Sequence, residues 1–180
     1  ADDAVNYGAI GAVIGHEIGH GFDDQGSQFD GAGNLRMWWT EQDRAQFDAL
    51  AQQLIEQFNQ IESPSAPGKF INGALTVGEN IGDLAGIGIG YAAYRIALGD
   101  QPAPELDGLT GDQRFFAGWA QVWMGKSREE TATMLLAVDP HSPQEVRANA
   151  VRNFDEFHAA FGVQPGDRMW LAPEDRVRIF

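Results

Sequence analysis

The opening of the chain is apolar with few charges. Residues 9–20, AIGAVIGHEIGH, combine aliphatic and small side chains without proline, which suits a buried helix although its glycines weaken it. Gly21 can end this helix. Residues 23–35 are rich in Asp, Gly and Asn, a composition typical of an irregular loop. We therefore expect a buried helix followed by a loop.

The clearest amphipathic pattern follows that loop. Apolar side chains recur every three or four residues at Phe47, Leu50, Leu54, Phe58 and Ile61. Thr40 suits the N-cap, and Asp43 places an acid in the first turn, where the helix dipole favours it. The pattern predicts a helix that stops near Ser63-Pro64.

A second long helix is expected from about Val77 to residue 98. The preceding stretch, from Ser63 to Gly73, contains two prolines and an Asn72-Gly73 turn signal, so we interpret it as a connection. Residues 99–108, which include two further prolines, are interpreted as a loop.

Shorter helices are expected in the remaining third of the chain. Thr110 and Gln113 form a capping box for a helix on which Trp119 and Trp123 share a face. Further helix signals lie at residues 128–138, at Ser142-Pro143 with Glu145, and at Asn153 with Glu156, running to Gly162. Strand signals are almost lacking. The sequence predicts a mainly α fold with little β structure.

Composition and charge limit the possible functions. A chain of 180 residues that is 43% hydrophobic suits one domain over residues 1–180, and no apolar run approaches the roughly 20 residues of a transmembrane segment. Its net charge of −14 makes nucleic acid an unsuitable partner. The first residues lack the features of a signal peptide, and both a secreted or periplasmic and a cytoplasmic location stay open. Without cysteine, any metal site must use His and carboxylates.

The sequence His16-Glu17-Ile18-Gly19-His20 suggests a metal site. Two histidines four residues apart lie on one face of a helix, where both imidazoles can reach a single tetrahedral Zn²⁺. Glu17 is offset around the helix and is placed to act on water as a general base. The alternative is a chance pair of helical histidines.

A hydrolytic zinc site needs a third protein ligand, and carboxylates are the available candidates. Glu79 and Asp83 lie four residues apart in a helix that is otherwise apolar or small, a poor place for unused charge. We expect Glu79 to be the ligand. Asp83 and Asp23 are candidates to accept the second N–H of each ligand histidine and so to orient its ring. The alternative is that all three acids are simply solvated.

These motifs resemble the neprilysin and endothelin-converting enzyme family of zinc peptidases. VNYGAIGAVIGHEIGHGFDDQG, GALTVGENIGDLAG, FFAGWAQVW, DPHSPQEVRANAVRNFDEFHAAF and MWLAPEDRVRIF occur in the order of that family's C-terminal catalytic region, across essentially the whole chain. The resemblance implies a zincin, thermolysin-like portion with one Zn²⁺ per chain. It implies His16, His20 and Glu79 as ligands and Glu17 as base, with Asp23 and Asp83 orienting the histidines.

The resemblance also implies two roles that the residues alone do not indicate. His141 matches a histidine that stabilises the tetrahedral intermediate, and Arg147 matches an arginine that binds a substrate backbone carbonyl. Without the resemblance, His141 is a loop histidine between Pro140 and Pro143, with or without a function. The family's Asn-Ala substrate-binding stretch and large N-terminal portion are missing, so the chain is interpreted as a fragment. The lack of cysteine points to a bacterial member.

Other patterns are weaker. The glycines of GIGIG, residues 86–90, are interpreted as helix-packing residues, because no strand precedes them as in a dinucleotide-binding motif. Residues 24–34 lack the ligand spacing of a calcium loop. Trp38 and Trp39 are expected to be packing residues, and His158 is expected to be structural or exposed.

The leading hypothesis is a zinc endopeptidase acting on small peptides. Its partners would be peptide substrates and the missing N-terminal portion of the same enzyme. One alternative is a zinc-binding fragment that is inactive without that portion. Another is an acidic helical interaction domain whose HExxH pattern is accidental.

Overall fold

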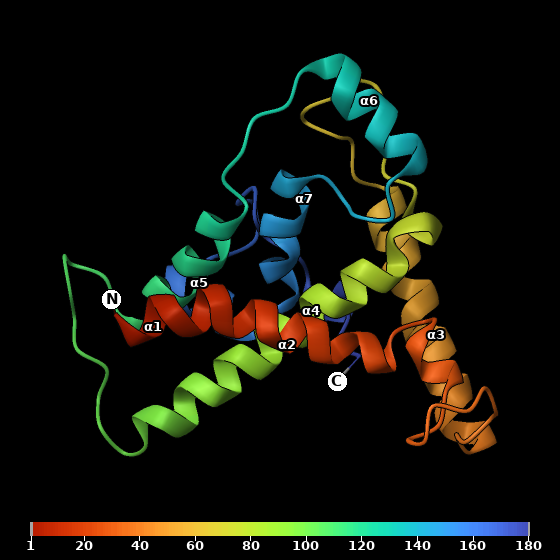
Figure 1. Cartoon of the computed structure of the whole chain (residues 1–180). Coiled ribbons are helices and arrows are strands. Elements are labelled where there is room, and N and C mark those ends of the chain that lie inside the picture. The colour runs from red at the N-terminus through yellow and green to blue at the C-terminus, as the bar shows by residue number, and fades with distance from the viewer. Residues whose placement is uncertain (1, 180) are drawn as a thin grey trace.

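One continuous helical run opens the computed structural model, which describes residues 2–179 (Figure 1). It comprises α1 (Asp3–Asn6), a π-helix (Tyr7–Gly11), α2 (Ala12–Gly19) and a 3₁₀ helix (His20–Phe22). The run begins six residues before the predicted start at Ala9. The expectation of a buried helix is wrong for one face, where three isoleucines one turn apart are 55–60% exposed: Ile10, Ile14 and Ile18.

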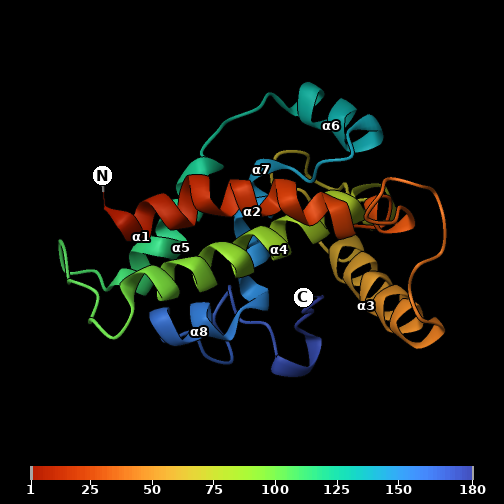
Figure 2. The same ribbon diagram turned by 60° about the horizontal axis from the view of Figure 1, so that its bottom comes forward.

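Helix α4 (Gly73–Leu98) is the central element and packs along α2. The 3₁₀ helix Asn149–Asn153 contacts α4 as well, and Figure 2 shows α2 and the C-terminal segments on different sides of it. Glycine permits the close approach to α2: a Cβ at Gly86 would lie 2.3 Å from the carbonyl oxygen of Ala12. The interpretation of GIGIG as packing residues is confirmed at Gly86 and Gly90, whereas a Cβ at Gly88 would make only an ordinary contact with Phe154, at 3.7 Å.

The predicted start of α4 near Val77 is wrong by four residues. Asn72 is the N-cap, and its side chain accepts a hydrogen bond from the amide of Leu75 at 3.1 Å. Gly73 is the first residue of α4, and glycine is needed there because the helix start lies close to α3: a Cβ would lie 2.3 Å from the carbonyl oxygen of Ile55. The Asn72-Gly73 pair is thus the start of a helix and not a turn in the connection, since Asn is favoured both as a helix N-cap and in turns.

Helix α3 (Glu41–Asn59) follows the predicted amphipathic pattern. The Thr40 side chain accepts from the amide of Asp43 at 3.1 Å, which confirms the N-cap. The helix ends four residues before Ser63, the predicted stop. Before it, the loop contains a 3₁₀ helix (Gly26–Gln28) whose Ser27 carbonyl accepts from both indole N–H groups of Trp38 and Trp39, as expected for packed rather than functional tryptophans.

The C-terminal half contains α5 (Gly111–Val122), α6 (Glu129–Val138), α7 (Gln144–Ala148), α8 (Asp155–Phe161) and a 3₁₀ helix (Pro173–Asp175). The capping box of Thr110 and Gln113 is confirmed. Asn153 is not the cap of α8. Its side-chain oxygen instead accepts from Nε2 of Gln57 at 3.0 Å and from the backbone N–H of Val177 at 2.8 Å. His158 is structural, because Nε2 contacts the carbonyl oxygen of Arg152 at 2.9 Å.

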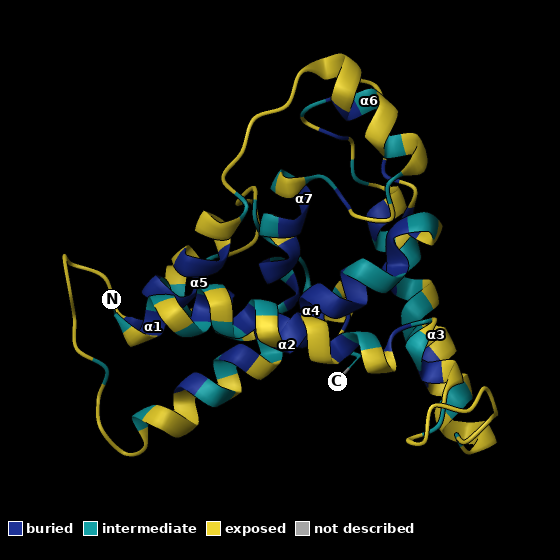
Figure 3. Ribbon diagram, viewed as in Figure 1, coloured by how far each residue is buried: buried dark blue, intermediate teal, exposed yellow. Residues whose placement is uncertain are grey.

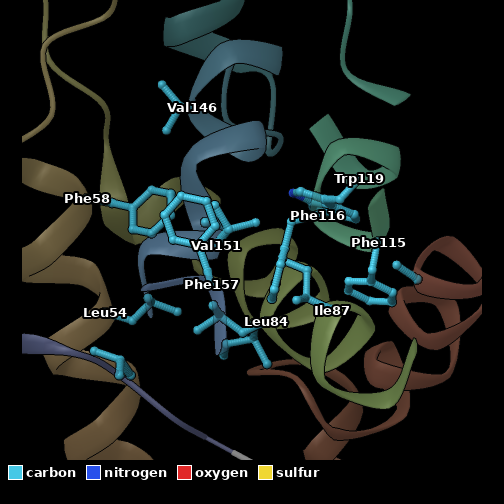
Figure 4. Close-up of a cluster of buried hydrophobic side chains, with 14 of the residues drawn as sticks. Leu54, Phe58, Leu84, Ile87, Phe115, Phe116, Trp119, Val146, Val151 and Phe157 are labelled. Atoms are coloured by element: carbon cyan, nitrogen blue, oxygen red, sulfur yellow. The ribbon is translucent and has the colours of Figure 1, made fainter. Parts of the chain in front are cut away.

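The core lies where α4, α5, α7 and α8 meet α3 (Figure 4). Phe115, Phe116 and Trp119 of α5 pack with Leu84 and Ile87 of α4, and the predicted shared face of Trp119 and Trp123 is confirmed. Helix α6 stands apart and is mostly exposed (Figure 3). The core therefore fixes α4, which carries Glu79, and α7, which carries Arg147.

The mainly α fold with little β structure is confirmed. Within residues 2–179, β pairing is limited to isolated bridges, for example between Glu62 and Phe70. None of the helices in this range has the length and apolar character needed to cross a bilayer.

Candidate metal centre

His16 and His20 lie one turn apart at the C-terminal end of α2, as their spacing predicts. Their ring centroids are 4.6 Å apart and the rings are almost perpendicular. His16 is buried, whereas His20 is partly exposed. Glu17, between them, is exposed on the next face of the helix.

Glu79 reaches this pair from α4. Oε2 lies 3.2 Å from Nε2 of His16, and Oε1 lies 3.7 Å from Nε2 of His20. One ligand atom from each of the three residues lies within 4.8 Å of the others. Helices α2 and α4 thus bring two imidazoles and a carboxylate together, as predicted, although His20 and Glu79 are 59 positions apart in the sequence.

Asp83 and Asp23 contact the other nitrogen of each imidazole. Nδ1 of His16 lies 3.0 Å from Oδ1 of Asp83, and Nδ1 of His20 lies 2.7 Å from Oδ2 of Asp23. Because a carboxylate accepts, each Nδ1 donates to its aspartate, while Nε2 of each ring faces Glu79. Asp23 is fixed in turn, since Oδ1 accepts from the amides of Gln25 and Gly26 at 2.8 and 2.7 Å.

The donor set fits a zinc ion. Oε2 of Glu79 is buried beside the imidazoles, yet it meets hydrogen-bond geometry with no group among residues 2–179. A cation coordinated by Glu79, His16 and His20 would satisfy this oxygen. Two imidazoles and one carboxylate are a known ligand set of catalytic zinc, which leaves a fourth position open.

The electrostatics agree with a cluster that needs positive charge. Burial by itself lowers the pKa of His16, but the contacts with Asp83 and Glu79 outweigh it and raise the pKa to about 9. Burial raises the pKa of Glu79, whereas contact with His16 and the nearby charge of His141 and His20 lower it below its ordinary value. Without a metal, a proton on His16 supplies positive charge to the neighbouring carboxylates.

His141 and Arg147 lie at the same point. Nε2 of His141 is 3.2 Å from Oε2 of Glu79, although this side chain is 48% exposed. Arg147 donates through Nε and Nη2 to Asp83 at 2.9 and 2.7 Å, and its guanidinium lies 3.9 Å from the ring centroid of Trp123. A cavity of about 260 Å³ adjoins both residues.

The sequence did not indicate three contacts of this site. Asp139 accepts from the backbone amide of His141 at 2.9 Å and contacts its Nδ1 at 2.7 Å. Ser142 bonds Asn80, the residue after Glu79. The Asp139-Pro140-His141 spacing could have suggested the first contact, but nothing in the sequence relates Ser142 to Asn80.

Comparison with known proteins agrees with this geometry. The sequence profile described as Peptidase family M13 matches residues 1–177. The chain belongs to peptidase family M13. The resemblance to neprilysins is thereby confirmed, and with it the zincin-like fold. A bacterial origin remains a prediction, because the relatives of this M13 chain include animal and bacterial proteins.

Two curated relatives illustrate the similarity. Neprilysin-1 of Caenorhabditis elegans is 48% identical over 172 residues, which cover 92% of this chain and 23% of that protein. Neutral endopeptidase of Lactobacillus helveticus is 42% identical over 176 residues, which cover 97% of this chain and 25% of that protein. The M13 chain thus spans about a quarter of the length of these relatives.

A solved structure has the same fold. The crystal structure of zinc metalloprotease Zmp1 of Mycobacterium tuberculosis, in complex with an inhibitor, superposes with a TM-score of 0.96 at 55% identity. The match covers 99% of this chain and 28% of that one. The helices that bring His16, His20 and Glu79 together are therefore arranged as in a zinc metalloprotease of the M13 family.

Proposed function

We propose that this chain is the catalytic part of a zinc-dependent endopeptidase that hydrolyses small peptides. The observation that carries the proposal is the convergence of His16, His20 and Glu79, with Asp83 and Asp23 on the outer nitrogens of the histidines. These three ligands would hold one Zn²⁺ per chain. Membership of peptidase family M13 and the names of its relatives, neutral endopeptidase and zinc metalloprotease, support the same activity.

Zinc bound there would polarise the scissile carbonyl and lower the pKa of a bound water to about 7. Glu17 is the general base: its carboxylate takes a proton from the attacking water as the new C–O bond forms. The same carboxylic acid then gives the proton to the leaving amine as the C–N bond breaks. Its place beside His16, on an exposed face, leaves Glu17 accessible to substrate.

His141 and Arg147 act on the substrate. His141 faces Glu79 through Nε2, and as an imidazolium whose Nδ1 donates to Asp139 it can donate a hydrogen bond from Nε2 to the carbonyl oxygen as negative charge develops. Arg147 is held by Asp83 through Nε and Nη2, so Nη1 is the group available to a substrate backbone carbonyl. Arg147 would thus fix the register of the peptide.

Residues 1–180 are proposed to be the C-terminal catalytic portion of a longer enzyme. The aligned relatives are about four times as long, as their 23–25% coverage implies. Ile10, Ile14 and Ile18 form an outer apolar ridge on the zinc-site helix, opposite the face that packs on α4. This ridge would be covered by the N-terminal portion of the same polypeptide, since exposed contiguous apolar side chains mark interfaces.

The alternative is a zinc-binding fragment that is inactive without that portion. Metal quantification by mass spectrometry of the chain beside its Glu79→Ala variant tests the site, and about one zinc per wild-type chain is expected. A peptide-cleavage assay then separates an active enzyme from an inactive fragment. A wild-type chain that binds no zinc would instead favour an acidic helical interaction domain.

A further inference from the structure

A buried polar chain runs beside the metal centre. The Ser142 hydroxyl donates to Oδ1 of Asn80 at 2.8 Å, and Nδ2 of Asn80 donates to the Thr76 hydroxyl at 2.9 Å. The Thr76 hydroxyl donates to the carbonyl oxygen of Asn72 at 3.2 Å. Ser142, Asn80 and Thr76 are at most 4% exposed. Buried polar groups are costly unless paired, so this chain defines one arrangement of the segments that it joins.

Those segments carry two groups of the proposed active site. Asn80 directly follows Glu79 in α4, and Ser142 directly follows His141 in the connection between α6 and α7. The hydrogen bond therefore ties the backbone next to Glu79 to the backbone next to His141, across 62 positions of the sequence.

The position of His141 depends on this hydrogen bond more than the positions of the other site residues do. Its ring is half exposed, and its partner Asp139 belongs to the same connection, so this contact cannot set the distance of the ring from α4. Helix α6, which precedes the connection, stands away from the other helices in Figures 1 and 2. Another anchor to α4 is the Arg147–Asp83 pair, six residues after His141.

We propose that Asn80 and Ser142 are positioning residues that hold His141 at the metal centre. The proposal rests on the proposed function, because it concerns the imidazole that would stabilise developing charge. Neither residue reaches substrate; both act through the backbone of the connection. Misplacing a catalytic group by about 1 Å can cost on the order of 10²-fold in rate.

Ring NMR of the four histidines in the cobalt-loaded chain is the direct test, with His141 assigned from a His141→Gln variant. Paramagnetic shifts report the position of each ring relative to the metal. In Ser142→Ala we expect the paramagnetic shift of the His141 ring to decrease, or its resonance to broaden. The rings of His16 and His20 should keep their paramagnetic shifts. Ser142→Thr, which keeps the hydroxyl, should restore the wild-type shift.

Ser63→Ala is the matched control. The Ser63 hydroxyl is also buried but makes no hydrogen bond within the described residues, so its removal should leave His141 unchanged. Asn80→Ala and the double variant with Ser142→Ala should displace His141 as Ser142→Ala does, because each loses the Ser142–Asn80 bond; Asn80→Ala loses the bond to Thr76 as well. Asn80→Asp keeps the oxygen that accepts from Ser142, so it should retain the wild-type His141 shift. In a peptide-cleavage assay of the longer enzyme, Ser142→Ala should lower kcat about 10-fold or more and change KM less than twofold.

An unchanged His141 shift in a folded, cobalt-loaded Ser142→Ala chain would overturn the positioning role. Equal displacement of His16, His20 and His141 would also overturn it, since that result indicates general loosening. Failure of the wild-type chain to bind cobalt would overturn the proposed function and the positioning role together.

Discussion

Gly82 of α4 lies directly against the imidazole of His16. A Cβ at Gly82 would lie 2.8 Å from both Nδ1 and Cε1 of that ring, well inside van der Waals contact. Nδ1 is also the atom that contacts Asp83. A methyl group therefore cannot be added to α4 at this point unless the ring of His16 moves.

Gly82→Ala should lower zinc affinity about 10- to 100-fold, the range typical of a lost contact that orients a ligand histidine. Alanine favours helix over glycine by about 1 kcal/mol, so helix stability does not explain a loss. Gly88→Ala in the same helix is the control, because a Cβ there would meet only Phe154, at 3.7 Å. Competition with a chelator measures the zinc affinity of both variants. Equal affinities for the two variants would contradict the steric argument.

Glu17→Gln should leave zinc bound but abolish peptide hydrolysis in the longer enzyme. The amide has nearly the shape of the carboxylate, yet it cannot accept the proton of the attacking water. Zinc content by mass spectrometry and kcat with a short peptide are the measurements. Near-normal turnover in this variant would show that another group is the base.

Glu79→Ala should lower zinc occupancy far more than Asp83→Ala. The first variant removes a metal ligand, whereas the second removes a partner of His16, a change that typically costs about 10- to 100-fold in affinity. Zinc dissociation constants of the two variants give the comparison. Equal losses would mean that the roles of the two carboxylates are reversed.

Asp2→Asn tests a pH-dependent contribution to stability away from the metal. Asp2 contacts Nε of the buried Arg114 at 2.5 Å, and this hydrogen bond lowers the pKa of Asp2 below its ordinary 3.8. A depressed folded-state pKa stabilises the fold fully above the unfolded value and loses this effect as pH falls through the folded value.

The variant should thus be less stable by roughly 1 kcal/mol at pH 7, because solvent screens a partly exposed pair. The difference in free energy of unfolding should shrink below about pH 4. Urea denaturation of the zinc-free chain at pH 7 and pH 3 is the measurement, with Asp3→Asn at the exposed neighbour as control. A difference that grows toward low pH would reverse the inferred sign.

The chain alone should bind zinc but cleave peptides very poorly compared with the longer enzyme. An extended substrate usually pairs with an edge strand that supplies main-chain hydrogen bonds, and the described residues form only isolated bridges. A site open to water also weakens the stabilisation that His141 offers. The two proteins should be assayed on one short peptide at equal zinc occupancy. Comparable kcat/KM values would show that residues 1–180 suffice.

The sequence by itself determined the features that depend on neighbouring residues. Helical periodicity located α3, and local capping chemistry identified Thr40 and the box of Thr110 with Gln113. The four-residue spacing of His16 and His20 placed both imidazoles on one face, because helix geometry fixes that relation in any context. The choice of Glu79 as their partner rested on chemistry, since a charge in an apolar helix needs a use.

Only the tertiary structure decided the relations between segments. Helix α4 begins at Gly73, where the glycine lies against the backbone of α3. The Asn153 side chain forms hydrogen bonds with Gln57 and Val177 and does not cap a helix. The tertiary structure also pairs Ser142 with Asn80. Spacing along one helix is set by bonded geometry, but contacts between distant segments depend on how α2, α4 and α7 pack, and no local pattern encodes that packing.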